Sequence, residues 1–268
     1  MKPELRMGLI GAGGVTRSFL SRMPVLLGRI GPVKASSFRV ARRIANSLRA
    51  GNAVTSYSEL AGCSLLWISV PDTGLDRLFR DLAAATPLAG KTVVLCGSTR
   101  DSFWPSPLLA AGARVVTLNC VEESHEKLFV AEGDPEAMRD LRRLMASERR
   151  RLIELRAASK ALYLAGTHLA SHLLLPWIAA SVESLRLAGF SRAEATRLAS
   201  ALGAKALRSY GKAGSKAWSP SAADQLGLSI ARDLETIRGA DAKLAALYAG
   251  GVEQVLGYFA PRKRAAGR

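Results

Sequence analysis

The first 156 residues alternate between short apolar runs and segments in which apolar positions recur every three or four residues. The apolar runs predict strands, and the helical spacing predicts amphipathic helices. The predicted strands are Met7–Ile10, Val33–Ser36, Leu65–Val70, Lys91–Cys96, Arg114–Leu118, Leu128–Ala131 and Leu152–Leu155. The predicted helices are Val15–Leu27, Arg39–Leu48, Leu75–Ala85, Phe103–Ala111 and Pro135–Met145. Strands that alternate with helices of this length predict parallel βαβ units.

The pattern changes after Arg156, where strand signals stop and helical periodicity continues to the end. The expected helices are Ala157–Leu187, one that a Ser191–Glu194 capping box opens toward Tyr210, one from Ser221, and Ala240–Tyr258, with a loop over 211–220. We therefore expect an α/β fold. An N-terminal Rossmann-type parallel-sheet domain spans residues 1–156, an all-α domain spans 157–262, and a basic tail spans 263–268.

A glycine-rich turn joins the first predicted strand to the first predicted helix, over Gly11-Ala12-Gly13-Gly14-Val15-Thr16. In a dinucleotide-binding turn the first glycine permits the tight bend, and the second lets backbone N–H groups approach the pyrophosphate at the helix N-terminus. The third position of this pattern is normally Gly or Ala, and here it is Thr16. The strand before the turn and the helix after it favour a dinucleotide site over an ordinary glycine-rich turn.

The residues at the end of the second predicted strand bear on the choice of cofactor. NAD-binding chains usually place a carboxylate there to hold the ribose 2′-hydroxyl. This segment is Lys34-Ala35-Ser36-Ser37-Phe38-Arg39, which contains no acid. Because hydroxyl groups and a guanidinium suit a 2′-phosphate, the segment predicts NADP in preference to NAD. The alternative is that its arginine only coats a surface helix.

Two further strand ends are expected near the cofactor, since ligands of open α/β sheets bind beyond the carboxyl ends of the strands. Val70-Pro71-Asp72 comes at the end of the predicted strand Leu65–Val70, and Gly97-Ser98-Thr99 follows the predicted strand Lys91–Cys96. For Asp72 the alternative is an ordinary turn residue. The residues predicted to bind the cofactor are Gly11, Gly13, Gly14, Val15, Ser36, Ser37, Arg39, Val70, Pro71 and Ser98.

Polar side chains form a stripe along the predicted long helix, at spacings of three and four residues. They are Lys160, Tyr163, Thr167 and Ser171, with His168 and His172 on the flank. We predict Lys160 as the catalytic residue, either as a general acid or as a cation that polarises a carbonyl group. The predicted substrate contacts are Asn119, Thr167, His168, Ser171 and His172. The alternatives are a solvated lysine and histidines of a core or interface, and no metal site is expected.

Composition narrows the classes of protein that remain. The net charge is +16, but no basic run is interleaved with aromatic residues, so nucleic-acid binding ranks last. Three cysteines without a C-x-x-C pair argue against a disulfide framework or structural zinc and favour a cytoplasmic protein. The stretch between Lys160 and Glu183 lacks Asp, Glu, Lys and Arg but contains histidines and a proline. We expect it to be a helix buried within a bundle or a dimer interface and not in a membrane, and we expect a homodimer that forms through the helical domain.

The order of the motifs resembles that of the Rossmann-like proteins that carry a C-terminal domain of unknown function numbered 2520. These are relatives of 6-phosphogluconate dehydrogenase-like and pyrroline-5-carboxylate reductase-like enzymes. The resemblance spans nearly the whole chain and rests on Ile10-Gly11-Ala12-Gly13, Ser69-Val70-Pro71-Asp72, Cys96-Gly97-Ser98, Glu132-Gly133-Asp134, Lys160-Ala161-Leu162-Tyr163 and Leu247-Tyr248.

Three positions depart from this family's pattern. Asn119-Cys120 replaces His-Pro, Leu164 replaces His, and His172 replaces Asn. The resemblance and the motifs together predict an NADP-dependent oxidoreductase that acts on a small carbonyl, imine or hydroxyl compound. The alternative hypothesis is a non-catalytic dinucleotide-binding protein, a sensor or scaffold, in which these departures mark lost cleft residues.

Overall fold

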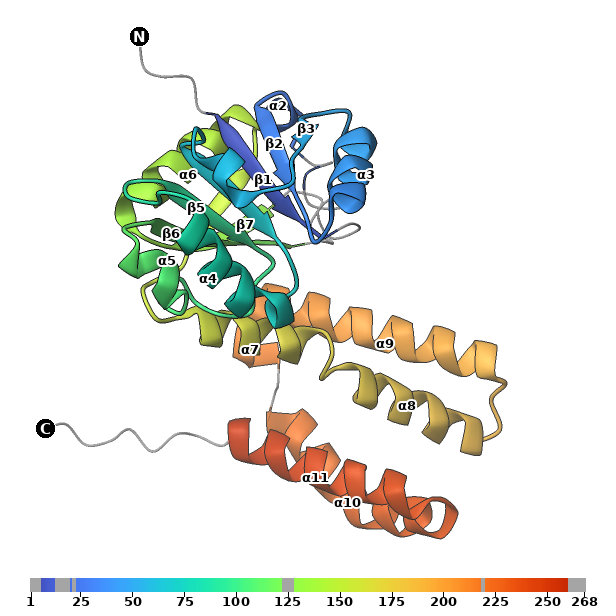
Figure 1. Cartoon of the computed structure of the whole chain (residues 1–268). Helices are drawn as coiled ribbons and strands as arrows, with labels where there is room; N and C mark the ends of the chain where they lie inside the picture. The colour runs from blue at the N-terminus through green and yellow to red at the C-terminus, as the bar shows by residue number, and fades with distance from the viewer. Residues whose placement is uncertain (1–5, 13–19, 21–22, 122–127, 218–219, 260–268) are drawn as a thin grey trace, which may run out of the picture. The chain divides into compact units, whose positions relative to one another are not determined.

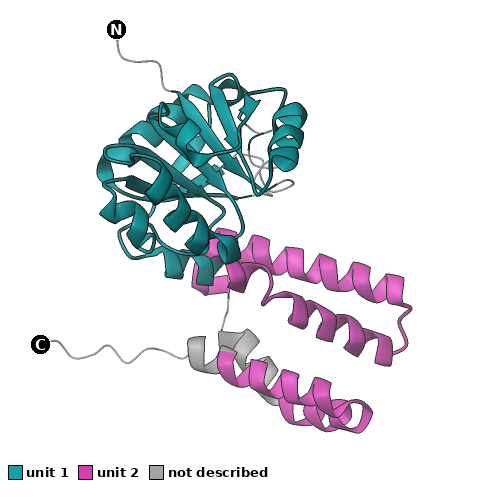
Figure 2. Ribbon diagram, viewed as in Figure 1, with its two compact units in different colours: residues 1–166 teal, residues 167–268 magenta. Residues whose placement is uncertain are grey.

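A computed structural model describes residues 6–12, 20, 23–121, 128–217 and 220–259. The chain divides into two compact units, residues 1–166 and 167–268 (Figure 2). The sequence predicts a domain boundary after Arg156, whereas the division between the compact units falls inside a helix, after Gly166.

The first unit is built on one eight-stranded sheet (Figure 1). Its strands are β1 (Met7–Gly11), β2 (Ile30–Lys34), β3 (Asn52–Ala53), β4 (Leu65–Ser69), β5 (Thr92–Cys96), β6 (Arg114–Cys120), β7 (Leu128–Gly133) and β8 (Arg151–Glu154). They are arranged in the order β3-β2-β1-β4-β5-β6-β7-β8. Neighbouring strands are parallel except β6 and β7. The order 3-2-1-4-5 is that of a Rossmann-type sheet, and the chain reverses its direction across the sheet between β1 and β4.

Helices cover both faces of this sheet because the apolar side chains of each strand alternate between the faces. Met7 and Leu9 join a core that includes α3 (Phe38–Leu48) and α6 (Pro135–Ser147). Ile10 joins the opposite core, which includes α4 (Leu75–Ala85) and α5 (Ser106–Ala110). The short elements are α2 (Pro24–Leu27), η1 (Tyr57–Leu60) and η2 (Asp72–Gly74).

The second unit is helical. Apart from α7 (Lys160–Ala170), which the division crosses, its elements are α8 (Leu175–Leu187), α9 (Arg192–Ala213), η3 (Gly214–Ala217), α10 (Pro220–Ala240) and α11 (Ala242–Phe259). Within the unit, α8 packs against α9, and α10 packs against α11. The predicted fold class, a Rossmann-type sheet followed by an all-α part, is confirmed. No helix among the described residues is long and apolar enough to span a membrane.

Several predicted elements have different bounds in the structure. The single helix predicted over Ala157–Leu187 is wrong, because turns at 171–174 separate α7 from α8. Pro176 lies in the first turn of α8, where its missing N–H costs nothing, whereas inside a continuous helix it would remove a hydrogen bond. The second strand begins at Ile30 instead of Val33 and ends at Lys34. The predicted loop over 211–220 is partly helical, since α9 continues to Ala213 and η3 follows.

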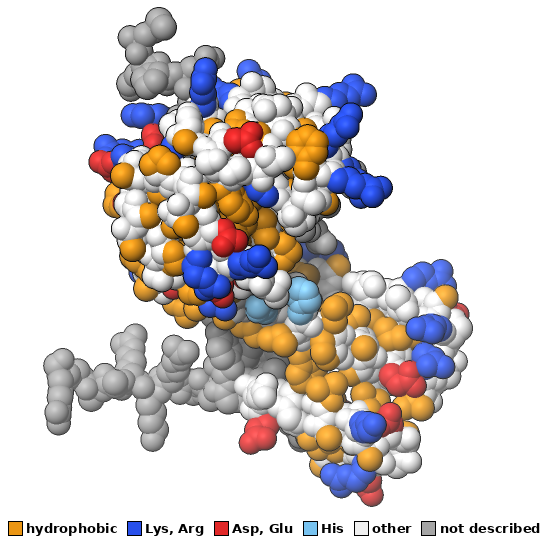
Figure 3. All heavy atoms as spheres, in the orientation of Figure 1, with side chains coloured by type: hydrophobic (Ala, Val, Ile, Leu, Met, Phe, Trp, Pro, Cys, Tyr) orange, Lys and Arg blue, Asp and Glu red, His pale blue; other side chains and the backbone are white. Residues whose placement is uncertain are grey.

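Apolar side chains remain exposed along the helices of the second unit, and Figure 3 shows many of them on one face of the molecule. The large exposed ones are Leu169, Leu173, Leu174, Leu175, Trp177, Ile178, Leu187, Phe190, Leu202, Leu207 and Tyr210. The described residues of this unit include few buried hydrophobic side chains, and most of those are small: Ala195, Ala199, Leu244 and Ala245. The described helices of this unit therefore leave much of their apolar surface uncovered.

Candidate functional site

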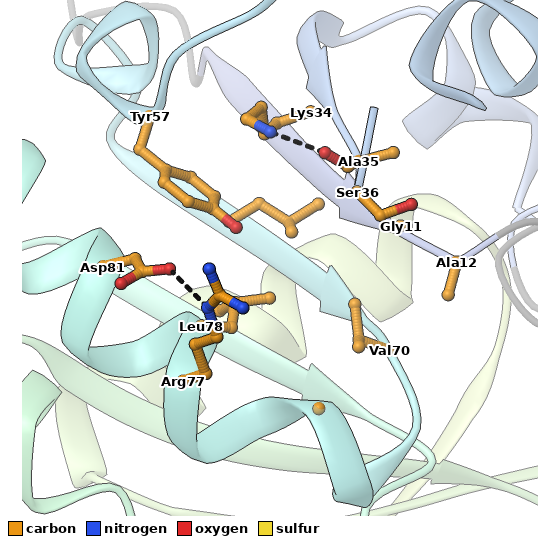
Figure 4. A pocket seen from close by; sticks show the side chains of 12 residues that line it. Gly11, Ala12, Lys34, Ala35, Ser36, Tyr57, Val70, Arg77, Leu78 and Asp81 are labelled. Atoms are coloured by element: carbon orange, nitrogen blue, oxygen red, sulfur yellow. Dashed lines mark hydrogen bonds and ion pairs between the residues drawn. The ribbon is translucent and has the colours of Figure 1, made fainter. Parts of the chain in front are cut away.

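A cavity of about 450 Å³ opens at the carboxyl ends of β1, β2 and β4 (Figure 4). This is the point at which the strand order reverses, where open α/β sheets bind their ligands. The lining residues are Ile10, Gly11, Ala12, Lys34, Ala35, Ser36, Tyr57, Val70, Gly74, Arg77, Leu78 and Asp81. Gly11, Ser36 and Val70 of the predicted cofactor site therefore line one cavity. Gly13, Gly14 and Val15 lie outside the described residues.

Two basic side chains lie on opposite walls of this cavity (Figure 4). The Lys34 Nζ donates a hydrogen bond to the Ala35 carbonyl oxygen at 2.5 Å and lies 4.8 Å from the centre of the Tyr57 ring. On the other wall, the Arg77 Nε is 3.6 Å from a carboxylate oxygen of Asp81. Burial, followed by the Asp81 charge, raises the pKa of Tyr57, so its hydroxyl stays protonated at neutral pH.

The residues predicted to select NADP lie in different positions at the end of β2. Ser36 lines the cavity. Ser37 is the N-cap of α3, and its hydroxyl accepts a hydrogen bond from the Val40 N–H at 3.3 Å. Arg39 is exposed in the first turn of α3. Lys34 lies in the segment that the sequence singled out, but Arg77 comes from α4, and no spacing in the sequence relates it to β2.

The ends of β4 and β5 are joined through Asp72, next to the predicted residue Pro71. One carboxylate oxygen of Asp72 accepts hydrogen bonds from the Thr99 N–H, at 2.9 Å, and from the Thr99 hydroxyl. Its other oxygen is buried and has no hydrogen-bond partner within the described part of the chain. The Asn119 side-chain amide donates to the Ser98 carbonyl oxygen at 3.2 Å. These hydrogen bonds therefore connect the turns after β4 and β5 with each other and with the end of β6.

Lys160, the predicted catalytic residue, is at the start of α7 and belongs to the first unit. Its side chain is buried, with 2% of the residue exposed, and the described residues offer no hydrogen-bond partner to its Nζ. Burial lowers the pKa of Lys160 to about 8 from the ordinary 10.5, although the charges of Glu132, Asp72, Asp101 and Cys96 oppose this shift.

Glu132 is a buried carboxylate that the sequence did not single out as a site residue. It is 2% exposed and lies on β7 directly opposite Thr117 of β6. Its oxygens accept hydrogen bonds from the Ser102 N–H at 2.8 Å, the Ser102 hydroxyl at 2.9 Å and the Thr117 hydroxyl at 2.9 Å. Thr117 is the central residue of β6, so the antiparallel pairing of β7 places Glu132 beside the middle of β6, a position that the sequence alone does not reveal.

The remaining predicted substrate residues belong to the second unit. Thr167 is partly exposed, and Ser171 and both histidines are exposed. Since α7 ends at Ala170, Ser171 and His172 lie beyond the helix on which the stripe was predicted. The rings of His168 and His172 meet edge to face at 5.8 Å. No group of three or more His, Cys, Asp or Glu side chains in the described ranges is placed to hold a metal ion.

The chain matches no protein-family model and no curated protein sequence, so its resemblance to the proteins with domain 2520 stays a prediction. Solved structures share its fold. A candidate NADP oxidoreductase from Bacteroides fragilis is 14% identical, with coverage of 94% of this chain and 97% of that chain and a TM-score of 0.70.

Two further solved structures are described by their enzyme activities. A reductive aminase from Aspergillus terreus, in complex with NADPH and ethyl levulinate, is 16% identical, with coverage of 95% and 94% and a TM-score of 0.68. A pyrroline-5-carboxylate reductase from Coxiella burnetii is 12% identical, with coverage of 94% and 98% and a TM-score of 0.60. At these identities the likeness establishes the fold of nearly the whole chain.

The buried amine of Lys160 gives a testable dependence of stability on pH. Between pH 8 and pH 10.5 the unfolded chain binds a proton at Lys160 that the folded chain has released, so stability rises with pH. Relative to Lys160→Met, the wild type should gain about 3 kcal/mol of unfolding free energy across this range. Urea unfolding at several pH values measures the difference.

Lys160→Arg is the matched control, because a guanidinium remains charged throughout the range. Its stability relative to Lys160→Met should not change with pH. A difference between wild type and Lys160→Met that is constant from pH 7 to pH 10 would show that Lys160 titrates normally in the folded chain.

Proposed function

We propose that this chain is an NADP-dependent oxidoreductase that acts on a small carbonyl, imine or hydroxyl compound. The observation that carries the proposal is the buried Lys160, whose Nζ has no hydrogen-bond partner among the described residues. A buried ammonium group without such a partner costs free energy, and groups of this kind concentrate at sites where a ligand or reaction uses them.

The cavity at the reversal point of the sheet fits the adenosine half of NADP. Gly11 and Ala12 bring the chain out of β1 at the cavity wall, as a dinucleotide-binding turn requires. Lys34 and Arg77 supply positive charge at the walls, and Ser36 supplies a hydroxyl, which together suit a 2′-phosphate. Two of the three solved neighbours support the choice, since one is in complex with NADPH and the other is described as an NADP oxidoreductase.

Lys160 would supply the proton of the reaction. The cofactor, when bound, would supply the hydride for the substrate carbon, and the ammonium group of Lys160 would give its proton to the substrate oxygen or nitrogen and become a neutral amine. Because its pKa is about 8, Lys160 is mostly protonated at pH 7 and still gives up its proton readily. Reduction is therefore favoured below pH 8, and the reverse oxidation, which needs the neutral amine, is favoured above it.

The helical unit would serve as the interface of a homodimer. Its described helices expose large apolar side chains, including Leu207 at 68% and Leu169 at 65%. Large exposed apolar side chains that gather on one part of a protein mark interaction surfaces, and a second copy of the same unit would cover them.

Binding of the four nicotinamide dinucleotides tests the cofactor proposal. By isothermal titration calorimetry, NADPH should bind more tightly than NADH. Lys34→Ala and Arg77→Ala should each weaken NADPH binding roughly tenfold, because each removes a positively charged donor from the cavity wall, and should change NADH binding less.

Arg80→Ala is the matched control, because Arg80 is exposed on the same helix as Arg77 but does not line the cavity. It should bind NADPH as the wild type does. Equal affinities for NADPH and NADH would contradict the assignment of the 2′-phosphate site, and the absence of binding by any dinucleotide would contradict the proposed function itself.

Oligomeric state tests the proposed interface. Light scattering after size-exclusion chromatography should give twice the mass of one chain, and Leu207→Glu should shift the protein toward the monomer. Phe38→Glu, which places the same charge on an exposed aromatic position of the first unit, should leave the dimer intact. A wild-type monomer at micromolar concentration would refute the interface.

A further inference from the structure

Glu132 is a buried carboxylate whose hydrogen bonds hold it in place but bring no positive charge to compensate its own. In the described part of the chain, its donors are the backbone N–H and hydroxyl of Ser102 and the hydroxyl of Thr117. All three donors are neutral. Taking an ionised carboxylate out of water is costly unless a positive charge compensates it, so these bonds alone leave the charge of Glu132 without a partner.

Lys160 is a buried group of the opposite charge that also lacks a partner of its own among the described residues. It is a buried amine in the first turn of α7, with no hydrogen-bond partner for its Nζ among the described residues. The charge of Glu132 is the strongest of those that favour its protonated form. The other groups that act on it from neighbouring elements are Asp72 of η2, Asp101 of the loop after β5, and the Cys96 thiol of β5.

The other two carboxylates are held by local contacts nearer the surface. Asp101 accepts hydrogen bonds from the Phe103 and Trp104 N–H groups, at 3.1 and 3.0 Å, as the cap of its own loop. Asp72 bonds to Thr99 and is half-buried. Glu132 alone among the three is fully buried, so its field acts on Lys160 with the least screening by water.

We infer that Glu132 is a positioning residue for Lys160: its buried carboxylate, which Ser102 and Thr117 hold in place, supplies the negative charge that faces the buried Lys160 amine, which has no hydrogen-bond partner in the described part of the chain. The Ser102 and Thr117 bonds orient the carboxylate, and its charge compensates the buried ammonium group without forming a direct hydrogen bond. The protons of Nζ therefore remain available to a substrate. The role of the Glu132–Lys160 pair in catalysis rests on the proposed function, whereas the electrostatic interaction between the two residues does not depend on it.

The titration of Lys160 in the protein without cofactor tests the pair. With ¹³C-labelled lysine, the Cε resonance of Lys160, assigned by its loss in Lys160→Met, should have a midpoint near pH 8 in the wild type. In Glu132→Gln the midpoint should fall by about one pH unit or more, because removal of the negative charge disfavours the ammonium form. Glu136→Gln removes a carboxylate of equal charge from the exposed face of α6 and should leave the midpoint unchanged.

An unchanged midpoint in folded Glu132→Gln would overturn the inference. If Glu132→Gln does not fold, as judged by circular dichroism, Glu132→Asp replaces it. This variant keeps the charge but withdraws it by one methylene, so the midpoint should still fall, by a smaller amount, and an unchanged midpoint there also overturns the inference.

The measurement separates this inference from the proposed function, since it uses neither NADPH nor turnover. If the protein binds no dinucleotide but the titration midpoint of Lys160 depends on Glu132, the proposed function is contradicted and the Glu132–Lys160 interaction is supported. Tight NADPH binding with a midpoint indifferent to Glu132 would do the reverse.

Discussion

The burial of one ammonium group is the constraint on which the candidate site depends. Lys160 must be protonated to serve as an acid, yet its burial opposes the charge, and no hydrogen bond from the described residues stabilises it. The charges of nearby carboxylates partly offset the free-energy cost of burying the ammonium group, although none of those among the described residues forms a hydrogen bond with it. An ion pair in direct contact would hold the proton more tightly and would occupy the donors that a substrate needs.

The sheet topology explains how these groups come together. The carboxyl ends of the parallel strands lie on one side of the sheet. The ends of β1, β2 and β4 therefore contribute to the cavity, and Asp72, Ser98 and Asn119 lie together at the ends of β4, β5 and β6. In the single antiparallel step, from β6 to β7, Glu132 lies opposite Thr117, the central residue of β6. Gly133, which follows it, is in a conformation with φ of 151°, and a Cβ there would lie 2.4 Å from the Val115 carbonyl oxygen.

The sequence predicted the local features of this site and missed those that depend on tertiary placement. The apolar runs predicted the strands, the glycine-rich turn and the strand ends predicted three of the cavity residues, and the polar stripe predicted Lys160. Arg77 carries no local signal, because it lies on an ordinary amphipathic helix. Glu132 belongs to a motif of the family resemblance, but nothing in that motif marks its carboxylate as a site residue. The long helix was predicted too long because periodicity continues through Pro176, and only the backbone chemistry of proline interrupts it.

The central claim is that the cavity and the buried Lys160, with the carboxylates that act on it, are parts of one site. It is tested most directly by repeating the Lys160 titration with saturating NADPH. If the cofactor lies beside the amine, its binding should displace the Cε resonance of Lys160 or its titration midpoint, while the exposed Lys243 on α11 should not respond. Saturation with NADPH that leaves both the resonance and the midpoint of Lys160 where they were would show that the cavity and the lysine act separately, and would contradict the account.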